Sequence, residues 1–358
     1  MTPEFKIAVF QGDGIGPEIM APTVALLESL AAGSGYTFDF QDYPAGAAHY
    51  AKTGESLPAA SMDGARAADA ILLSAMGLPS IRYDDGTEIA PQIDLRKALT
   101  LFAGVRPVTI RPGQPTPLAT DKPVDFVLIR ESTEGLFYTQ GRGEVEADEA
   151  RETLRITREI SEPLFRFAFD LAEARKAAGT GPGKVTCVDK ANVFRAFAFF
   201  REMFDAEAAK RPGIEADHAY VDATALWMVE RPWSFDVMVT ENMFGDILSD
   251  LGAGLMGGLG LAPSADIGAD HAVFQPCHGS APDIAGQGVA NPIAMILSGA
   301  MMLEWLAGRH DVPAMAADAL RLRRAVDAVV SEGRVLTRDL GGSAGTADVV
   351  RAVEEALA

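Results

Sequence analysis

Short apolar runs recur along the chain and alternate with longer segments of helical periodicity. The first run, KIAVF, leads through a glycine-rich turn into a segment with Pro17 and Glu18 in the first turn of a helix, where both residue types are favoured. Strands that alternate with helices predict an α/β fold with a mostly parallel sheet. The runs that we interpret as strands lie at residues 6–10, 70–76, 125–131, 184–190, 218–223 and 235–242.

Three segments between these runs predict the organisation of the chain. Residues 106–123 and 179–184 are rich in proline and glycine, so we expect loops there and candidate boundaries between lobes. Residues 139–150 are polar and poorly periodic, which indicates an exposed loop or an arm that reaches a partner chain.

Composition limits the classes of partner. The chain has 358 residues, of which 48% are hydrophobic, and this is enough for a large core in two domains or one large α/β unit. A net charge of -19 argues against nucleic acid and membrane surfaces as partners, because both bind through clustered Lys and Arg. The start of the chain lacks the pattern of a signal peptide and no apolar run is long enough to cross a bilayer, so we expect a cytoplasmic protein.

The two cysteines, Cys187 and Cys277, are too few for a disulfide framework or a cysteine-based zinc site. We expect small buried hydrophobic side chains. The alternative is an oxidation-sensitive thiol near an active site.

Acidic residues follow two of the predicted strands. Asp246 and Asp250 are four residues apart, so they project from one helical face and repel each other unless a cation or an arginine lies between them. Such a pair is also typical of a solvated surface helix. However, open α/β sheets bind ligands where a strand passes into a helix, and Asp222 occupies a similar position. Three carboxylates would suit Mg²⁺ or Mn²⁺.

Basic residues offer a complementary set of donors. Arg96, Arg106 and Arg130 each stand near the end of a predicted element, and three converging guanidinium groups could hold both ends of a dicarboxylic acid. Taken singly, each is more typical of a surface charge. Lys190, at the end of a predicted strand, is either a proton-transfer group or a lysine that reaches solvent.

The glycine-rich segments do not predict a Rossmann fold. Residues 12–16 lack the GxGxxG spacing, and residues 252–257 have it but follow a helix. Residues 277–292, CHGSAPDIAGQGVANP, could line a nucleotide with small side chains and backbone amides. Asp283 in this run would accept hydrogen bonds from ribose hydroxyls and repel a 2′-phosphate, which favours NAD over NADP.

With these motifs in place, the chain resembles the β-decarboxylating dehydrogenases, which include isocitrate, isopropylmalate, homoisocitrate, tartrate and D-malate dehydrogenases. The resemblance runs nearly end to end and is nearest to the isopropylmalate and tartrate branch. The matching blocks are GDGIGPE at 12–18, LRKALTLFAGVRP at 95–107, RESTEG at 130–135, VDKAN at 188–192, YVDA at 220–223, FDVMVTENMFGDILSDL at 235–251, HGSAPDIAGQGVANP at 278–292 and DLGGSAGT at 339–346.

The resemblance implies a fold of the family's own α/β type, not a Rossmann fold. It implies a large NAD-binding lobe of residues 1–99 and 252–358 and a small lobe of residues 100–251. It further implies a homodimer in which Lys190 and Asp222 reach the neighbour's active site, with residues 139–150 as an intersubunit arm.

The same resemblance implies roles for individual residues. The substrate would be held by Arg96, Arg106, Arg130, Gln92 and Ile93. The metal would be held by Asp222, Asp246 and Asp250. Proton transfer would involve Lys190, Tyr138 and Asp222. The cofactor NAD would be held by His278, Gly279, Ser280, Ala281, Asp283, Asn291 and Asn192.

The implied reaction is oxidative decarboxylation of a malate-type 2-hydroxy dicarboxylic acid. A base removes the hydroxyl proton, hydride passes to NAD, and the resulting keto acid loses its β-carboxylate because the metal stabilises the enolate. An acid then protonates the enolate carbon.

Two departures from the family pattern leave alternatives open. The family's proton-donating tyrosine would fall at Phe137, and Tyr138 lies one residue later, on the opposite face if this segment is a strand. Either a bulge returns Tyr138 to the site, or Lys190 or water supplies the proton. A dehydrogenase that does not decarboxylate, or a relative with reduced catalysis that binds metal and NAD, is the alternative function.

The second departure concerns residues 90–94, APQID, which lie where the family reads the variable end of the substrate. Gln92 would suit a hydroxyl, and Asp94 would repel a third carboxylate. We therefore expect a tartrate-like, malate-like or alkylmalate substrate, and isocitrate fits least well.

Overall fold

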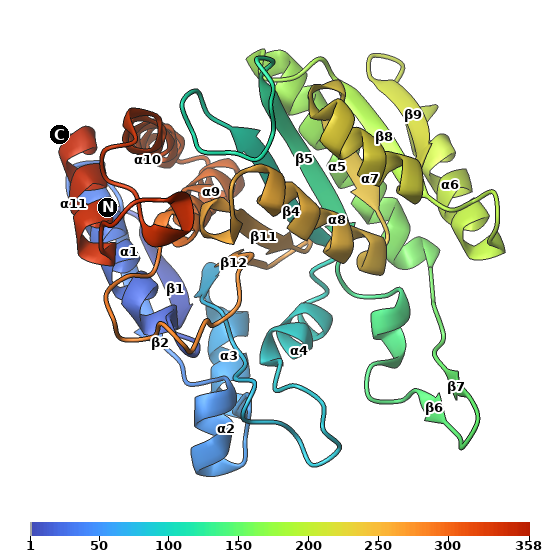
Figure 1. Ribbon diagram of the computed structural model, residues 1–358, viewed down its shortest axis with the longest axis horizontal. Coiled ribbons are helices and arrows are strands. Elements are labelled where there is room, and N and C mark those ends of the chain that lie inside the picture. Colours follow the sequence, from blue (N-terminus) through green and yellow to red (C-terminus); the bar gives the residue numbers. More distant parts are fainter. Residues whose placement is uncertain (1) are drawn as a thin grey trace.

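The computed structural model describes residues 2–358 and contains a ten-stranded sheet with the order β2-β1-β3-β12-β11-β4-β5-β10-β8-β9 (Figure 1). Its strands are β1 (Glu4–Phe10), β2 (Thr37–Asp42), β3 (Ala70–Leu73), β4 (Ala103–Ile110), β5 (Val124–Glu131), β8 (Lys184–Asp189), β9 (Glu215–Tyr220), β10 (Val237–Thr240), β11 (Pro263–Ile267) and β12 (Ala272–Pro276). The helices are α1 (Gly16–Ala31), α2 (Ala47–Thr53), α3 (Ala59–Ala67), α4 (Pro91–Ala98), α5 (Arg158–Ala178), α6 (Arg195–Ala208), α7 (Val221–Glu230), α8 (Asn242–Leu255), α9 (Ile293–His310), α10 (Pro313–Glu332) and α11 (Thr346–Leu357). Short 3-10 helices lie at Leu136–Thr139, Pro232–Ser234, Leu259–Leu261 and Arg338–Leu340.

The pairing of the strands confirms a mostly parallel α/β sheet. Neighbouring strands are parallel except at the centre, where β12 with β11, β11 with β4, and β4 with β5 are antiparallel. The six apolar runs in the sequence overlap β1, β3, β5, β8, β9 and β10, but residues 221–223 of the fifth run begin α7 instead of continuing β9. The longest helix, α5, lies between β7 and β8 in the chain.

The predicted loop at residues 106–123 was wrong at its start. Residues 106–110 belong to β4, and the loop begins only at Arg111. Pro107 misled the prediction. Pro107 lies beyond Val105, the last residue of β4 that pairs with β11. The strand β11 therefore needs no hydrogen bond from residue 107, and only β5 could require the N–H that proline lacks. The sequence analysis also missed the central strands β11 and β12.

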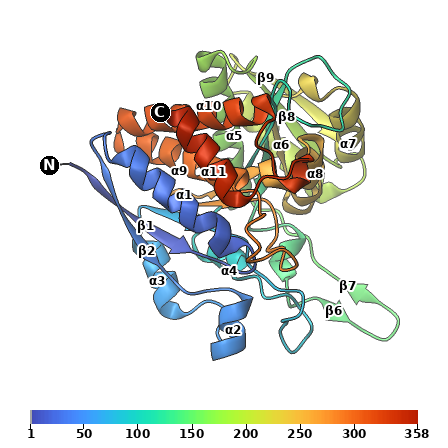
Figure 2. The same ribbon diagram turned by 60° about the vertical axis from the view of Figure 1, so that its left-hand side comes forward.

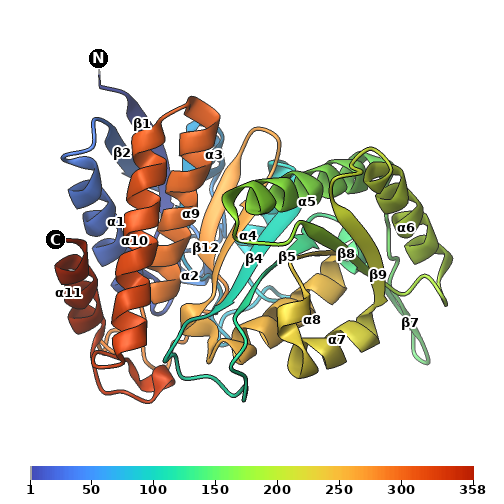
Figure 3. The same cartoon turned by 90° about the horizontal axis from the view of Figure 1, so that it is seen from above.

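Helices cover both faces of the sheet, and the alternation of side chains on β5 shows how. Val127 and Ile129 join the core under α5 and α9, whereas Phe126 and Leu128 join the core under α8. Figure 3 shows α5 and α8 on opposite sides of these strands. The α8 face also carries α4, so it is the face on which the predicted arginines and aspartates can meet.

The strands of the sheet fall into two neighbouring groups by their place in the sequence. Five neighbouring strands, β2 to β11, come from residues 1–99 and 252–358, and the other five come from residues 100–251. We propose that the two lobes join at the β11–β4 pair. The hairpin of β6 (Glu144–Val145) and β7 (Ala150–Arg151) projects away from the sheet as an exposed arm (Figure 2).

Among residues 2–358, no helix has both the length and the apolar character that a membrane span requires.

Candidate active site

Three predicted arginines and two predicted aspartates line one cavity of about 290 Å³ on the α8 face. Arg96 comes from α4, Arg106 from the interior of β4, Arg130 from the end of β5, and Asp246 and Asp250 from α8. The convergence of these side chains therefore comes from four elements that lie far apart in the sequence. Gln92 and Ile93 of α4, together with Glu88 and Phe137, line the same cavity.

The position of Arg130 depends on the close approach of α8. A Cβ atom at Gly245 would lie 2.6 Å from Arg130 Cγ, so a larger residue there would displace the arginine. Arg130 Nε and Nη2 donate to Asn242 Oδ1 at 2.9 and 2.7 Å, and Arg130 Nη1 donates to Asp246 Oδ1. Burial, reinforced by the charge of Arg96, lowers the pKa of Arg130 to about 10, so the guanidinium remains protonated at neutral pH.

A fully buried aspartate that the sequence analysis missed, Asp266 of β11, holds the other two arginines. Its Oδ2 accepts from Arg96 Nε at 3.0 Å, and its Oδ1 accepts from Arg106 Nη2 at 3.2 Å. Burial favours the protonated acid, but the charges of Arg96, Arg106 and Arg130 outweigh it and lower the pKa of Asp266. The available signal was an acid within the otherwise small and apolar run PSADI.

The two aspartates of α8 form an acidic pair at the cavity. They follow β10 directly, as expected for a strand that passes into a helix. Burial, reinforced by the charge of Asp246, raises the pKa of Asp250. Two neighbouring carboxylates of this kind can share a divalent cation.

Asp222, Lys190 and Asn192 lie outside this cavity. Lys190, just after β8, forms an ion pair with Asp222 at the start of α7, and Asn192 is exposed nearby. Within residues 2–358 no group of three acidic, His or Cys side chains is close enough to hold a metal. One chain therefore brings together only two of the three predicted metal ligands.

Phe137, and not Tyr138, faces the cavity. The segment is a 3-10 helix over Leu136–Thr139, so the strand geometry that we assumed for it was wrong. The Phe137 ring lies 5.3 Å from the Arg130 guanidinium carbon, whereas the Tyr138 ring stacks against Arg155 at 4.1 Å. Tyr138 does not line the cavity of its own chain.

A second cavity of about 300 Å³ adjoins the first, because His278 and Gly279 line both. Among the predicted cofactor residues, Ala281 and Asn291 also line it. Ser280 is buried beside it and donates to Gly77 O, and Asp283 is exposed on the loop outside. Burial lowers the pKa of His278, so its imidazole is neutral at pH 7, and its Nε2 is buried without a partner among the described residues.

Asp339 is the acidic group in this second cavity, and the sequence analysis did not assign it a role. It accepts from Asn291 Nδ2 at 3.0 Å and from Thr337 Oγ1. The block DLGGSAGT, in which it stands, was the signal that could have identified it.

The GDGIGPE segment supports the loop of residues 278–291. Ile15 N donates to Ser280 O at 2.8 Å, and a Cβ atom at Gly14 would lie 1.9 Å from that oxygen. Glu18 accepts from Gly286 N at 3.1 Å and from Ala290 N at 3.0 Å. Gly14 thus allows close backbone packing beneath the candidate nucleotide loop.

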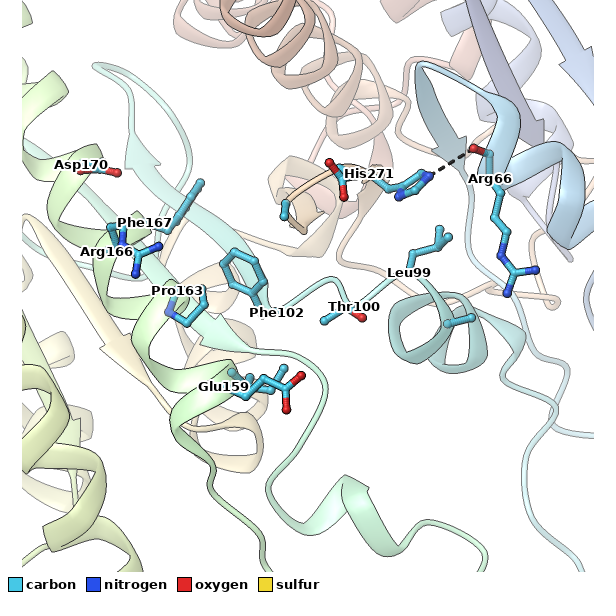
Figure 4. Close-up of a pocket in the computed structure, with 14 residues that line it drawn as sticks. Arg66, Leu99, Thr100, Phe102, Glu159, Pro163, Arg166, Phe167, Asp170 and His271 are labelled. Carbon is cyan, nitrogen blue, oxygen red and sulfur yellow. Dashed lines mark hydrogen bonds between the residues drawn. The ribbon is translucent and has the colours of Figure 1, made fainter.

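A larger cavity of about 710 Å³ lies on the α5 face, between α5 and the β11–β12 turn (Figure 4). Figure 4 shows Phe102 and Phe167 beside charged residues of both signs, and His271 hydrogen-bonded to the Arg66 carbonyl at 3.2 Å. No lining side chain in the described part of the chain is a buried polar group without a partner. The arginine-lined cavity is therefore the stronger candidate for the active site.

Comparisons with known proteins identify the family of the chain. The family described as "Isocitrate/isopropylmalate dehydrogenase" matches residues 6–353. The chain is 41% identical to a "3-isopropylmalate/3-methylmalate dehydrogenase" of Methanocaldococcus jannaschii, with 97% of each chain covered. It is 40% identical to a 3-isopropylmalate dehydrogenase of Streptococcus thermophilus, covering 97% of this chain and 98% of that one.

The solved structure of an isocitrate dehydrogenase from Methylococcus capsulatus superimposes with a TM-score of 0.86 at 39% identity and covers 99% of each chain. These relatives act on different acids by name, so similarity alone does not select a substrate. It does confirm the family and the fold that the sequence motifs indicated. The chain belongs to the isocitrate/isopropylmalate dehydrogenase family.

Proposed function

We propose that this chain catalyses the NAD-dependent and divalent-metal-dependent oxidative decarboxylation of a malate-type 2-hydroxy acid. The observation that carries this proposal is the convergence of Arg96, Arg106, Arg130, Asp246 and Asp250 on one cavity. Fixed guanidinium groups suit carboxylates and the acidic pair suits a hard cation.

The donor set fits Mg²⁺ or Mn²⁺. Asp246 and Asp250 present carboxylate oxygens from successive turns of α8, and their mutual repulsion favours a cation between them. When bound, the metal would supply a Lewis acid beside the 2-hydroxyl and its carboxylate. Arg130, which already donates to Asp246, would hold a substrate carboxylate next to that position.

A second subunit would complete the site. Lys190 and Asp222 form their ion pair away from the cavity of their own chain, in agreement with a homodimer that exchanges these residues. Leu226 and Val229 of α7 and Ile247 of α8 are exposed by half or more, and α7 packs against α8. This apolar surface would bury itself against a second copy.

The shared lining of the two cavities supports hydride transfer between substrate and cofactor. His278 and Gly279 lie at the boundary, so a nicotinamide ring there would contact an acid held by the arginines. The adenosine side would lie toward Asn291 and Asp339, with Asp283 exposed on the same loop. These acids favour NAD because they repel a 2′-phosphate.

Gln92 and Phe137 indicate, respectively, what the variable end of the substrate carries and where the proton for the enolate comes from. Gln92 Oε1 is buried without a partner among the described residues, which suits a substrate hydroxyl. With Phe137 at the cavity, the enolate proton would come from Lys190 of a second subunit or from water. Phe137 also favours the alternative of a relative with reduced catalysis that binds metal and NAD.

The test is formation of NADH from NAD, or of NADPH from NADP, with Mn²⁺ and each of D-malate, the tartrates, 3-methylmalate, 3-isopropylmalate and isocitrate. We expect turnover of at least one malate derivative, with NAD preferred. If metal and NAD bind but no 2-hydroxy acid is oxidised, the proposal fails.

A further inference from the structure

Asp266 lies behind the arginines and not in the cavity itself. Its side chain is fully buried on β11, between β12 and β4. Besides Arg96 and Arg106, its carboxylate accepts from Ser132 Oγ at 3.2 Å and from Gln275 Nε2 at 2.6 Å. A buried charge held by four donors fixes the groups around it.

We propose that Asp266 is a positioning residue that restricts the arginine-lined cavity to acids with two carboxylates. The proposal rests on the proposed function, because it names the class of acid that this same site accepts. The role of Asp266 is to orient two guanidinium groups and to cancel one of their charges.

The orientation follows from which donors Asp266 occupies. It accepts from Arg96 Nε and Arg106 Nη2, and both side chains line the cavity, so their other nitrogens are not engaged by Asp266. Arg106 Nη1 is buried and has no partner among residues 2–358. A carboxylate oxygen of the substrate would satisfy this unpaired guanidinium nitrogen.

The charge balance sets the number of carboxylates. The positive charges of Arg96, Arg106 and Arg130 are cancelled by Asp266 together with the acidic pair of α8. A divalent cation then adds two positive charges, which two carboxylates balance. The Lys190–Asp222 pair of a second subunit would add no net charge, and Glu88 at the exposed rim acts against a third carboxylate.

We expected Asp94 to repel a third carboxylate of the substrate. Asp266 is better placed for this role. Asp94 does not line the cavity, whereas Asp266 contacts two of its arginines directly. Removing a unit charge this close to a bound carboxylate changes affinity by about tenfold or more at an effective dielectric constant of about 20.

The experiment compares the binding of succinate and propane-1,2,3-tricarboxylate, neither of which can be oxidised here, by calorimetry with Mg²⁺ and without NAD. For the wild-type protein we expect succinate to bind at least about tenfold more tightly. In Asp266→Asn we expect this ratio of dissociation constants to fall by about tenfold, and in Asp266→Glu, which keeps the charge, to be largely retained.

Asp236→Asn is the matched control. Asp236 is also fully buried and accepts from an arginine, Arg175 Nε at 2.7 Å, but it lies outside the cavity. Its variant is expected to lose stability without any change in the ratio. A change in the ratio therefore separates the proposed role from a merely structural one.

Several outcomes would overturn the proposal. One is a wild-type protein that binds the tricarboxylate as tightly as succinate, a result that needs no variant. Another is a folded Asp266→Asn protein with an unchanged ratio, and a third is binding of neither acid. The ratio is measured without turnover, so it can hold even if the oxidation assay above fails, and the two failures are distinguishable.

Discussion

Arg130 donates a hydrogen bond from Nη1 to Asp246, so an arginine proposed to hold the substrate is paired with an aspartate proposed to hold the metal. The pair joins the end of β5 to the first turns of α8. Substrate and cation would therefore be bound at adjacent positions, and a change at Asp246 would affect both.

Asp246→Asn should weaken metal binding most. The amide keeps an acceptor for Arg130 but removes the negative charge that attracts the cation. We expect Mn²⁺ affinity, measured by titration calorimetry, to fall by a hundredfold or more with little change in the melting temperature. Asp63→Asn, at a carboxylate that is 77% exposed on α3, is the control. Unchanged Mn²⁺ affinity in Asp246→Asn would remove this residue from the metal site.

Subunit complementation tests the shared site. Lys190→Ala and Asp246→Asn should each be inactive as homodimers. In a heterodimer of the two, one site would carry both changes and the other neither, if Lys190 serves the neighbouring chain. A differently tagged, purified heterodimer should then recover about half of the wild-type activity. No recovery would mean that Lys190 acts within its own chain or that the chain is not a dimer.

The hydroxyl of Tyr138 should contribute little to catalysis. Its ring lies against Arg155 and outside the cavity of its own chain. We expect kcat of Tyr138→Phe to stay within about twofold of wild type, because a true general acid contributes about a hundredfold or more. Tyr50→Phe, at a ring that packs on Tyr83, is the control. A hundredfold loss confined to Tyr138→Phe would identify it as the proton donor after all.

Glu131, next to Arg130 on β5, predicts a pH-dependent term in stability. Burial raises the pKa of this carboxyl to about 7, although Thr133 and the Glu134 amide donate to it. The unfolded chain loses this proton near pH 4.5 and the folded chain near pH 7. The contribution of protonated Glu131 to the free energy of unfolding is therefore fully present below about pH 4.5 and is lost as pH rises toward 7.

Glu131→Gln should remove that slope. We compare the free energy of unfolding of the variant with that of the wild type at pH 4.5 and at pH 8, by denaturant unfolding. Between the two pH values we expect this difference to shift by about 1–3 kcal/mol in favour of the variant. Equal differences between the two proteins at both pH values would show that the Glu131 pKa is not raised.

Much of the sheet could be predicted from the sequence because its parallel strands are continuous apolar runs flanked by helices. The central strands β4 and β11 were harder, since their buried faces carry Arg106 and Asp266 in place of apolar residues. These two strands carry charged side chains at the candidate site, so the hydrophobic pattern did not identify them as strands.

Only part of the candidate site could be predicted, because sequence spacing shows which residues share one element but not which elements meet. Asp246 and Asp250 share a helical face, which spacing alone can show. The meeting of Arg96, Arg106 and Arg130 depends on strand order, and the role of Asp266 depends on contacts over more than a hundred residues. The direction of the Tyr138 side chain could not be predicted, because a 3-10 helix replaces the assumed strand.

The most direct test of the central claim is simultaneous measurement of NADH and CO₂ from the malate derivative that the wild-type protein oxidises best. We expect equal amounts of the two products, and loss of both when EDTA removes the metal. NADH without CO₂, or undiminished turnover in EDTA, would contradict the central claim.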